Sequence, residues 1–141
     1  MKVKQERSAG GVVFRNVGGQ VLWLITQHSQ HKGWGFPKGL IGDTNEDESM
    51  EDAALREVSE EGGVQTRIIN HDPVETSYTY KFKDTRVDKK VYYYLMEYLS
   101  GDPADHDWEV SEAKFVPEEE VFKTLTFDAD KDAFTKILKL S

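Results

Sequence analysis

The chain has 141 residues, with 18 Lys or Arg against 26 Asp or Glu, so its formal net charge is −8. This length fits one domain with a real core, and the acidic balance argues against an extended nucleic-acid groove. The sequence contains no cysteine, which excludes disulfides, thiol nucleophiles and thiolate metal sites. No apolar run could span a bilayer, and the first seven residues lack a signal h-region. We therefore expect a single domain over residues 1–141, in the cytoplasm, without a membrane partner.

The first half of the chain is predicted to hold a hairpin and one helix. Strands are expected over residues 12–15 and 21–25, joined by a turn at 16–19. A polar loop follows at 28–32, and residues 34–39 are too rich in glycine and proline for a regular element. Ser49 is a suitable N-cap for a helix that runs to about Glu61. The glycine pair at 62–63 should end that helix.

The second half is predicted to be mainly strand. Strands are expected over residues 64–70, 74–83, 91–99 and around 113–116, with a charged turn at 84–89. Pro117 suits the first position of a helix. A C-terminal helix over 128–140 would carry an apolar stripe. Together these elements predict an α/β (α+β) fold in which helices pack on the faces of a mixed sheet.

Three carboxylates dominate the predicted helix after Ser49. Glu57, Glu60 and Glu61 stand at i, i+3 and i+4, so a helix places them on one face within about one turn. Like charges this close repel unless a cation or a proton lies among them. Carboxylate oxygen suits Mg²⁺ or Mn²⁺ better than a soft metal. A glutamate-rich helix face is more often solvated surface, so the spacing alone leaves both interpretations open.

The residues around these glutamates carry a specific pattern. Residues 42–64 can be written G-x5-E-x7-R-E-V-x-E-E-x-G-V, which resembles the Nudix box of the Nudix hydrolase superfamily. Residues 8–15, 34–39 and 109–117 also resemble segments of that superfamily, in the same order. The sequence departs from the common pattern at one point, because Gly39 precedes the first glycine of the box by three residues.

The resemblance implies an αβα sandwich with a mixed central sheet, and hydrolysis of a nucleoside diphosphate linked to another group. It implies that Mg²⁺, with Mn²⁺ as the alternative, is held by box glutamates, and that Arg56 orients one of their carboxylates. The general base stays open among Glu57, Glu60 and Glu112. The implied metal ligands are Glu57, Glu60, Glu61, the backbone carbonyl of Gly39 and a late glutamate, Glu112 before Glu109, with Glu48 as an auxiliary ligand.

The substrate is predicted from residues outside the box. Tyr78 and Tyr80 alternate along one predicted strand, and the stretch resembles the dinucleoside polyphosphate hydrolases, in which a tyrosine here stacks on adenine. A lysine among Lys81, Lys83, Lys89 and Lys90 could hold a distal phosphate. Strand tyrosines also serve sheet packing, so that interpretation stays open. The candidate substrate-binding residues are Lys38, His31, Tyr78, Tyr80, Lys90 and Tyr92.

These expectations favour a Mg²⁺-dependent pyrophosphohydrolase that cleaves diadenosine tetraphosphate or a related dinucleoside polyphosphate by attack of water at phosphorus. Rival enzymes are a pyrophosphatase of nucleoside triphosphates or oxidised nucleotides, an RNA 5′-end pyrophosphohydrolase and a diphosphoinositol polyphosphate hydrolase. A rival of another class is a non-catalytic nucleotide-sensing domain. The expected partner is a small nucleotide, and the protein is expected to be a monomer or a homodimer.

Overall fold

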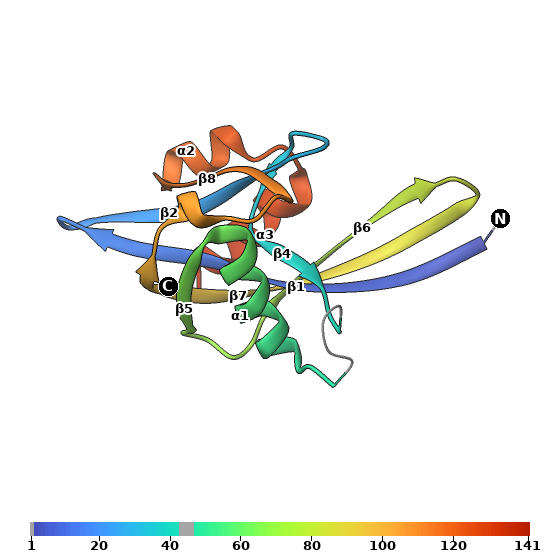
Figure 1. Ribbon diagram of the computed structural model, residues 1–141, viewed down its shortest axis with the longest axis horizontal. Coiled ribbons are helices and arrows are strands. Elements are labelled where there is room, and N and C mark those ends of the chain that lie inside the picture. Colours follow the sequence, from blue (N-terminus) through green and yellow to red (C-terminus); the bar gives the residue numbers. More distant parts are fainter. Residues whose placement is uncertain (1, 43–46) are drawn as a thin grey trace.

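A computed structural model describes residues 2–42 and 47–141. Its strands form one mixed sheet in which β1 and β7 are parallel, whereas the other recorded pairs are antiparallel (Figure 1). The main path of the sheet runs β3-β2-β1-β7-β5, with β4 beside β1, β6 beside β7 and β8 beside β2. The elements are β1 (Lys2–Val17), β2 (Gln20–His28), β3 (Trp34–Gly35), β4 (Lys38–Leu40), α1 (Met50–Gly62), β5 (Val64–Ile68), β6 (Val74–Phe82), β7 (Thr85–Gly101), the 3₁₀ turn η1 (Pro103–Asp105), β8 (Val110–Pro117), α2 (Glu118–Thr124) and α3 (Asp128–Leu138).

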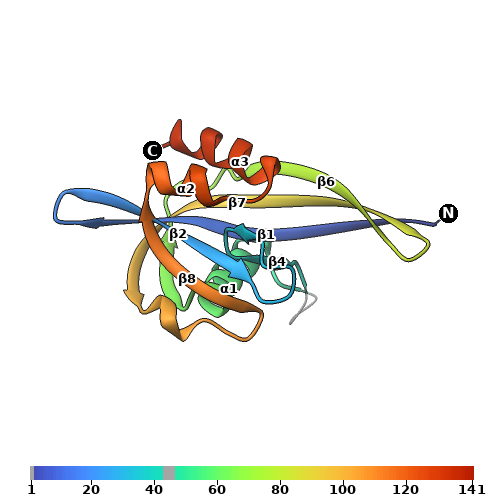
Figure 2. The ribbon, with the colours of Figure 1, turned by 90° about the horizontal axis from the view of Figure 1, so that it is seen from above.

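Helices cover both faces of the sheet, which confirms the predicted α/β fold class. α1 lies on one face, and α2 and α3 lie on the other (Figure 2). The core is accordingly split in two by the sheet. Val58 of α1 packs in one half, and Phe134 of α3 packs in the other. Within the described residues, no helix combines the length and the apolar character needed to cross a membrane.

Helix α1 begins and ends where its sequence predicts. The Ser49 side chain accepts a hydrogen bond of 3.1 Å from the backbone N–H of Asp52, which satisfies one free donor of the first turn. Ala53, Ala54 and Val58 are fully buried against the sheet. Gly63 ends the helix with φ of 72°, a left-handed conformation that costs glycine little. The helix is therefore fixed at both ends and along one face.

Three local predictions were wrong. Residues 84–89 are not a turn, because only Lys83 and Asp84 turn and β7 begins at Thr85. Pro117 is the N-cap of α2 and not its first helical residue. Residues 34–39 are not wholly irregular, because β3 pairs with β2 and β4 pairs with β1. In each case pairing with a neighbouring strand decided the conformation, and local composition did not.

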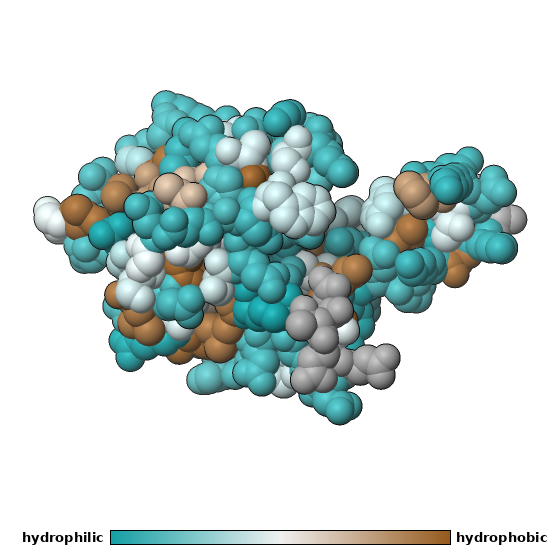
Figure 3. Space-filling model, viewed as in Figure 1, coloured by the Kyte–Doolittle hydropathy of each residue, from teal (hydrophilic) through white to brown (hydrophobic). Residues whose placement is uncertain are grey.

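A three-stranded projection extends away from the helices; we call it the arm and define it as residues 2–7 and 78–90. Figures 1 and 2 show it leaving the body on the side of the N-terminus, and Figure 3 shows it as a separate lobe. In the arm β7 is the central strand, between β1 and β6. The backbone N–H of Lys2 donates to the carbonyl of Asp84 at 3.3 Å, which ties the start of β1 to the turn between β6 and β7.

Candidate active site

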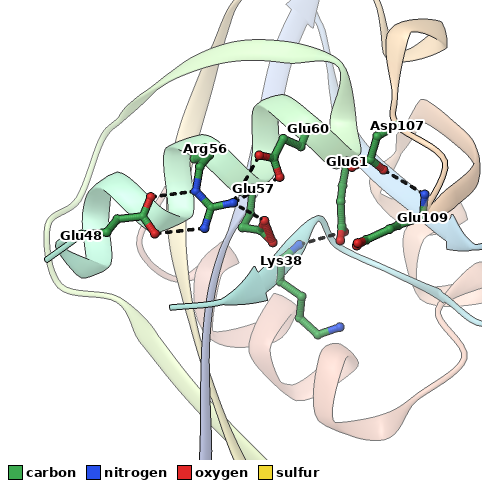
Figure 4. A network of polar contacts seen from close by, with 8 residues as sticks. All are labelled: Lys38, Glu48, Arg56, Glu57, Glu60, Glu61, Asp107 and Glu109. Carbon is green, nitrogen blue, oxygen red and sulfur yellow. Dashed lines mark hydrogen bonds and ion pairs between the residues drawn. The ribbon is translucent and has the colours of Figure 1, made fainter. Parts of the chain in front are cut away.

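Arg56 of α1 gathers three glutamates around its guanidinium (Figure 4). Its Nε and Nη2 donate to the two carboxylate oxygens of Glu48 at 2.7 and 3.0 Å, a bidentate pair. Its Nη1 donates to Glu57 Oε1 at 2.7 Å and to Glu60 Oε2 at 3.2 Å. The guanidinium keeps the pKa of Glu48 below its ordinary value, mainly through these hydrogen bonds. One cation therefore fixes the orientation of three carboxylates.

Glu57 reaches from α1 to β4. It is buried, with 3% of its surface exposed, and its carboxylate lies in the space that a side chain at position 39 would fill. Only a residue without a Cβ allows this approach. Burial, followed by the nearby Glu60, raises the pKa of Glu57 to about 7, although Arg56 acts in the opposite direction. The approach places the Glu57 carboxylate directly against the backbone of β4.

Glu61 lies one turn further along α1, on the same side as Glu57. Its Oε1 accepts a hydrogen bond of 3.2 Å from the backbone N–H of Lys38. Figure 4 shows Glu109 pointing toward Glu61 from the loop before β8. Burial raises the pKa of Glu61 to about 8, and the charges of Glu57 and Glu109 add to that rise. The backbone N–H and the positive charge of Lys38 oppose it without cancelling it.

The donor chemistry at this place fits a hard divalent cation. Buried Glu57 and half-buried Glu61, both with raised pKa values, gain from a nearby positive charge. Carboxylate and carbonyl oxygens are the ligands that Mg²⁺ prefers. In the described residues, however, no three carboxylate or imidazole side chains converge closely enough to enclose a metal as they stand. Glu57 and Glu60 instead share the guanidinium of Arg56. Residues 43–46 of the predicted box lie outside the described residues.

The two late glutamates take different places. Glu112 is exposed on β8, lies 3.9 Å from Lys114 and lines a shallow hollow with Asp102 and His106. Glu109 lies beside Glu61 (Figure 4). The structure therefore favours Glu109 over Glu112 as the late glutamate of the site. The preference for Glu112 came from the residue pattern alone, which does not show where the loop before β8 runs.

The substrate-side candidates divide between the two faces of the sheet. Tyr78 and Tyr80 share the face of β6 on which the Thr76 hydroxyl donates to the Ala129 carbonyl of α3 at 3.3 Å, and their ring centroids lie 6.3 Å apart. Lys89 is opposite Tyr78 across β6 and β7, so both side chains lie on that face. Burial lowers the pKa of Lys89, as does Lys38, whereas Glu6, Glu61 and Glu57 raise it. The pKa of Lys89 thus responds to the charges of the box glutamates and of Lys38 on β4.

Lys90 and Tyr92 lie on the opposite face of β7, because successive strand residues alternate. Tyr92 packs there under the guanidinium of Arg7, 5.5 Å from its ring centroid. His31 stacks on His28 with ring centroids 4.1 Å apart, and its Nδ1 accepts from the backbone N–H of Gly33 at 2.9 Å. Burial lowers the pKa of His31, and the charges of His28 and Lys38 lower it further.

Asp130 is a buried acid that the sequence pattern did not single out. Asp130 of α3 is 6% exposed and accepts a 2.8 Å hydrogen bond from the hydroxyl of Tyr93. Burial raises its pKa, while Lys38 and Tyr93 lower it. A lone aspartate at a helix N-terminus reads as a dipole partner in sequence. Its role as the acceptor for a buried tyrosine depends on a strand about forty residues earlier.

Residues 4–137 match the NUDIX domain family, so the chain belongs to that family. The chain is 34% identical over 133 residues to the protein called MutT4 of Mycobacterium tuberculosis, which covers 90% of this chain and 52% of MutT4. It is 42% identical over 55 residues to the RNA pyrophosphohydrolase of Pseudomonas putida, covering 39% of this chain and 31% of that protein. A C. elegans Ap4A hydrolase has the same fold, with a TM-score of 0.74, 23% identity and coverage of 96% and 99% of the two chains.

The chain thus spans about half the length of MutT4 and less of the RNA pyrophosphohydrolase. Family membership and fold follow from these similarities. The activity and the substrate of this chain are a separate question, which depends on the residues of the site.

Proposed function

We propose that this chain is a Mg²⁺-dependent pyrophosphohydrolase that acts on a nucleoside diphosphate linked to another group. The observation that carries the proposal is the arrangement of Arg56 with Glu48, Glu57 and Glu60, set against the backbone of Gly39. Family membership supports the same reaction. A mere surface cluster of glutamates would not need a buried carboxylate lying in the place of a missing Cβ.

Each residue has a distinct part in the proposed reaction. Glu57, Glu60, Glu61 and the Gly39 carbonyl would hold the cation, and Arg56 is a positioning residue for the carboxylates. A bound Mg²⁺ supplies neutralisation of phosphate charge and a lower pKa for an attacking water. A carboxylate of the site takes the proton of that water. Lys38 contributes a positive charge for a phosphate oxygen beside β4.

For the substrate we favour diadenosine tetraphosphate or a related dinucleoside polyphosphate. Two tyrosine rings on the α3 face and the lysines at 38 and 89 form a surface with aromatic and cationic character. Aromatic rings hold bases by stacking with little selectivity. The Ap4A hydrolase of C. elegans shares this fold. The MutT4 and RNA pyrophosphohydrolase similarities support nucleoside triphosphate and RNA 5′-end substrates as the alternatives.

The experiment is a substrate panel at fixed Mg²⁺, with products separated by chromatography. It contains diadenosine tetraphosphate, nucleoside triphosphates, a 5′-triphosphorylated oligoribonucleotide and a diphosphoinositol polyphosphate, each with and without EDTA. We expect asymmetric cleavage of diadenosine tetraphosphate, and its abolition by EDTA. Turnover of another compound alone would contradict the substrate, whereas no turnover of any compound would favour a non-catalytic nucleotide-sensing domain.

A further inference from the structure

The arm is basic, whereas the rest of the chain is strongly acidic. Residues 2–7 and 78–90 contain eight Lys or Arg and three Asp or Glu, a net charge of +5, so the remaining residues carry −13. The whole-chain value of −8 hides this segregation. A local basic surface, and not the average charge, decides whether a polyanion binds. The argument against nucleic acid that rests on the net charge therefore does not apply to the arm.

One face of the arm is built from repeated cross-strand rows. Strand register aligns Phe82 with Thr85 and Lys2, and it aligns Tyr80 with Val87 and Lys4. Each row thus carries an aromatic ring on β6 and a lysine on β1, with the rows about 6.7 Å apart because they repeat every two residues. The rows lie on the same face as α3 but beyond its end, where Figure 2 shows only strands.

The Tyr80 ring lies along the sheet surface and does not stand away from it. The Tyr80 hydroxyl donates to Glu6 Oε1 at 3.0 Å, so the side chain spans the central strand from β6 to β1. It thereby covers Val87, which is only 3% exposed, while Tyr80 itself is 39% exposed and Phe82 62%. Lys83 lies 5.5 Å from the centroid of the Phe82 ring. The Phe82 ring offers an accessible surface beside Lys83, whereas the Tyr80 ring lies beside the ion pair of Lys4 with Glu6, whose Nζ and Oε2 are 3.4 Å apart.

From these features we infer that the arm is a docking surface for single-stranded nucleic acid. It begins at Tyr80, one of the two rings of the proposed substrate surface, and continues outward through Phe82, away from the box carboxylates. Bases stack on exposed aromatic rings of a sheet, and lysines along the adjacent strand neutralise the phosphates. The positive charge excludes an apolar or basic partner. An acidic protein, including the acidic body of a second copy, would use the lysines but would leave the two rings without a stacking partner.

The test measures binding of a 5′-hydroxyl, fluorescein-labelled 12-mer RNA of mixed sequence to the whole chain by fluorescence anisotropy in EDTA. The 5′-hydroxyl and the EDTA remove catalysis from the measurement, and Lys2, Lys4, Lys83 and Phe82 lie outside the proposed substrate surface. A failure of the proposed function therefore does not decide this test. One variant combines Lys2→Gln, Lys4→Gln and Lys83→Gln. The matched control removes three exposed charges from the helical end, Lys123→Gln, Lys136→Gln and Lys139→Gln. Phe82→Ala and Tyr80→Leu test stacking, and Leu keeps Val87 covered.

We expect the arm variant to weaken RNA binding about tenfold or more and to flatten the slope of log affinity against log salt by about 2, with the control variant within twofold of the parent. Phe82→Ala and Tyr80→Leu should each weaken binding about tenfold. The same measurement with a single-stranded DNA 12-mer, which lacks the 2′-hydroxyl, separates recognition of the ribose from stacking of the bases. The inference is overturned if no saturable binding occurs, if a duplex binds as well, or if polyglutamate displaces the RNA at equal charge. It is also overturned if sedimentation shows that the arm variant abolishes a dimer and RNA does not bind.

Discussion

The Glu57 carboxylate occupies the space in which a Cβ of residue 39 would stand. Gly39→Ala should therefore push Glu57 away from β4 and lower both Mg²⁺ affinity and turnover, by about tenfold or more, because side chains that hold a metal depend on small displacements. Calorimetric titration with Mg²⁺ measures the first effect. The loss of stability caused by Gly39→Ala should shrink in a Glu57→Ala background, and an undiminished loss would contradict the steric cause.

Arg56 neutralises a buried carboxylate, so its removal leaves Glu57 without its cationic partner. Arg56→Gln should reduce the free energy of unfolding at pH 8 by on the order of 2 kcal/mol, the cost of an unsatisfied charged group. At pH 5 the loss should be smaller, because Glu57 is then mostly protonated. Urea unfolding at both pH values measures this. Arg67→Gln, which removes an exposed ion pair with Glu97, is the control and should cost less than about 1 kcal/mol. An equal loss at the two pH values would speak against the pairing.

Stability without metal should decline as pH rises. The pKa values of Glu57 and Glu61 are raised in the folded chain, to about 7 and about 8, above the ordinary value of the unfolded chain. Between the unfolded and the folded pKa of each glutamate, the folded state binds more protons than the unfolded state. The unfolding free energy therefore falls as pH increases from about 5 to 8. Denaturant titrations in EDTA should show this slope, and it should flatten in Glu57→Gln with Glu61→Gln. Stability that rises over that range would contradict the assignment.

The features that could be predicted from the sequence are those that depend on a residue and its near neighbours along the chain. Ser49 and Gly63 mark the ends of α1 because capping and left-handed backbone depend on the residue itself. The pairing of Arg56 with a box carboxylate was likewise expected from the pattern of residues 42–64. The arm was missed because residues 84–89 alternate charges around a single valine, and their strand conformation comes from β1 and β6 on either side.

The late glutamate illustrates the same limit within the site. Glu109 and Glu112 are three residues apart and chemically identical, and only the path of the loop before β8 distinguishes them. Lys89 and Lys90 are likewise separated by the alternation of β7, which needs a known register. Sequence patterns therefore supply the types of side chain in the site, while strand register and loop path decide which copies take part.

This difference between the two glutamates can be measured directly. Glu109→Gln should lower kcat by about tenfold or more, because its carboxylate lies with Glu61, whereas Glu112→Gln should stay within about twofold of the parent. Steady-state kinetics with the best substrate of the panel measures both. The substitutions remove one carboxylate each and are matched in size. A large effect of Glu112→Gln with none at position 109 would reverse the order proposed for the two residues.

The central claim is that box carboxylates support metal-dependent hydrolysis, and Glu57→Gln tests it most directly. The measurement is the initial rate of diadenosine tetraphosphate cleavage with Mg²⁺, for the parent and the variant, with circular dichroism to compare their folds. We predict that the variant keeps the fold, because a neutral amide replaces a carboxyl whose pKa is about 7, and loses at least 10²-fold in kcat. A folded Glu57→Gln variant with the full rate of the parent would contradict the account.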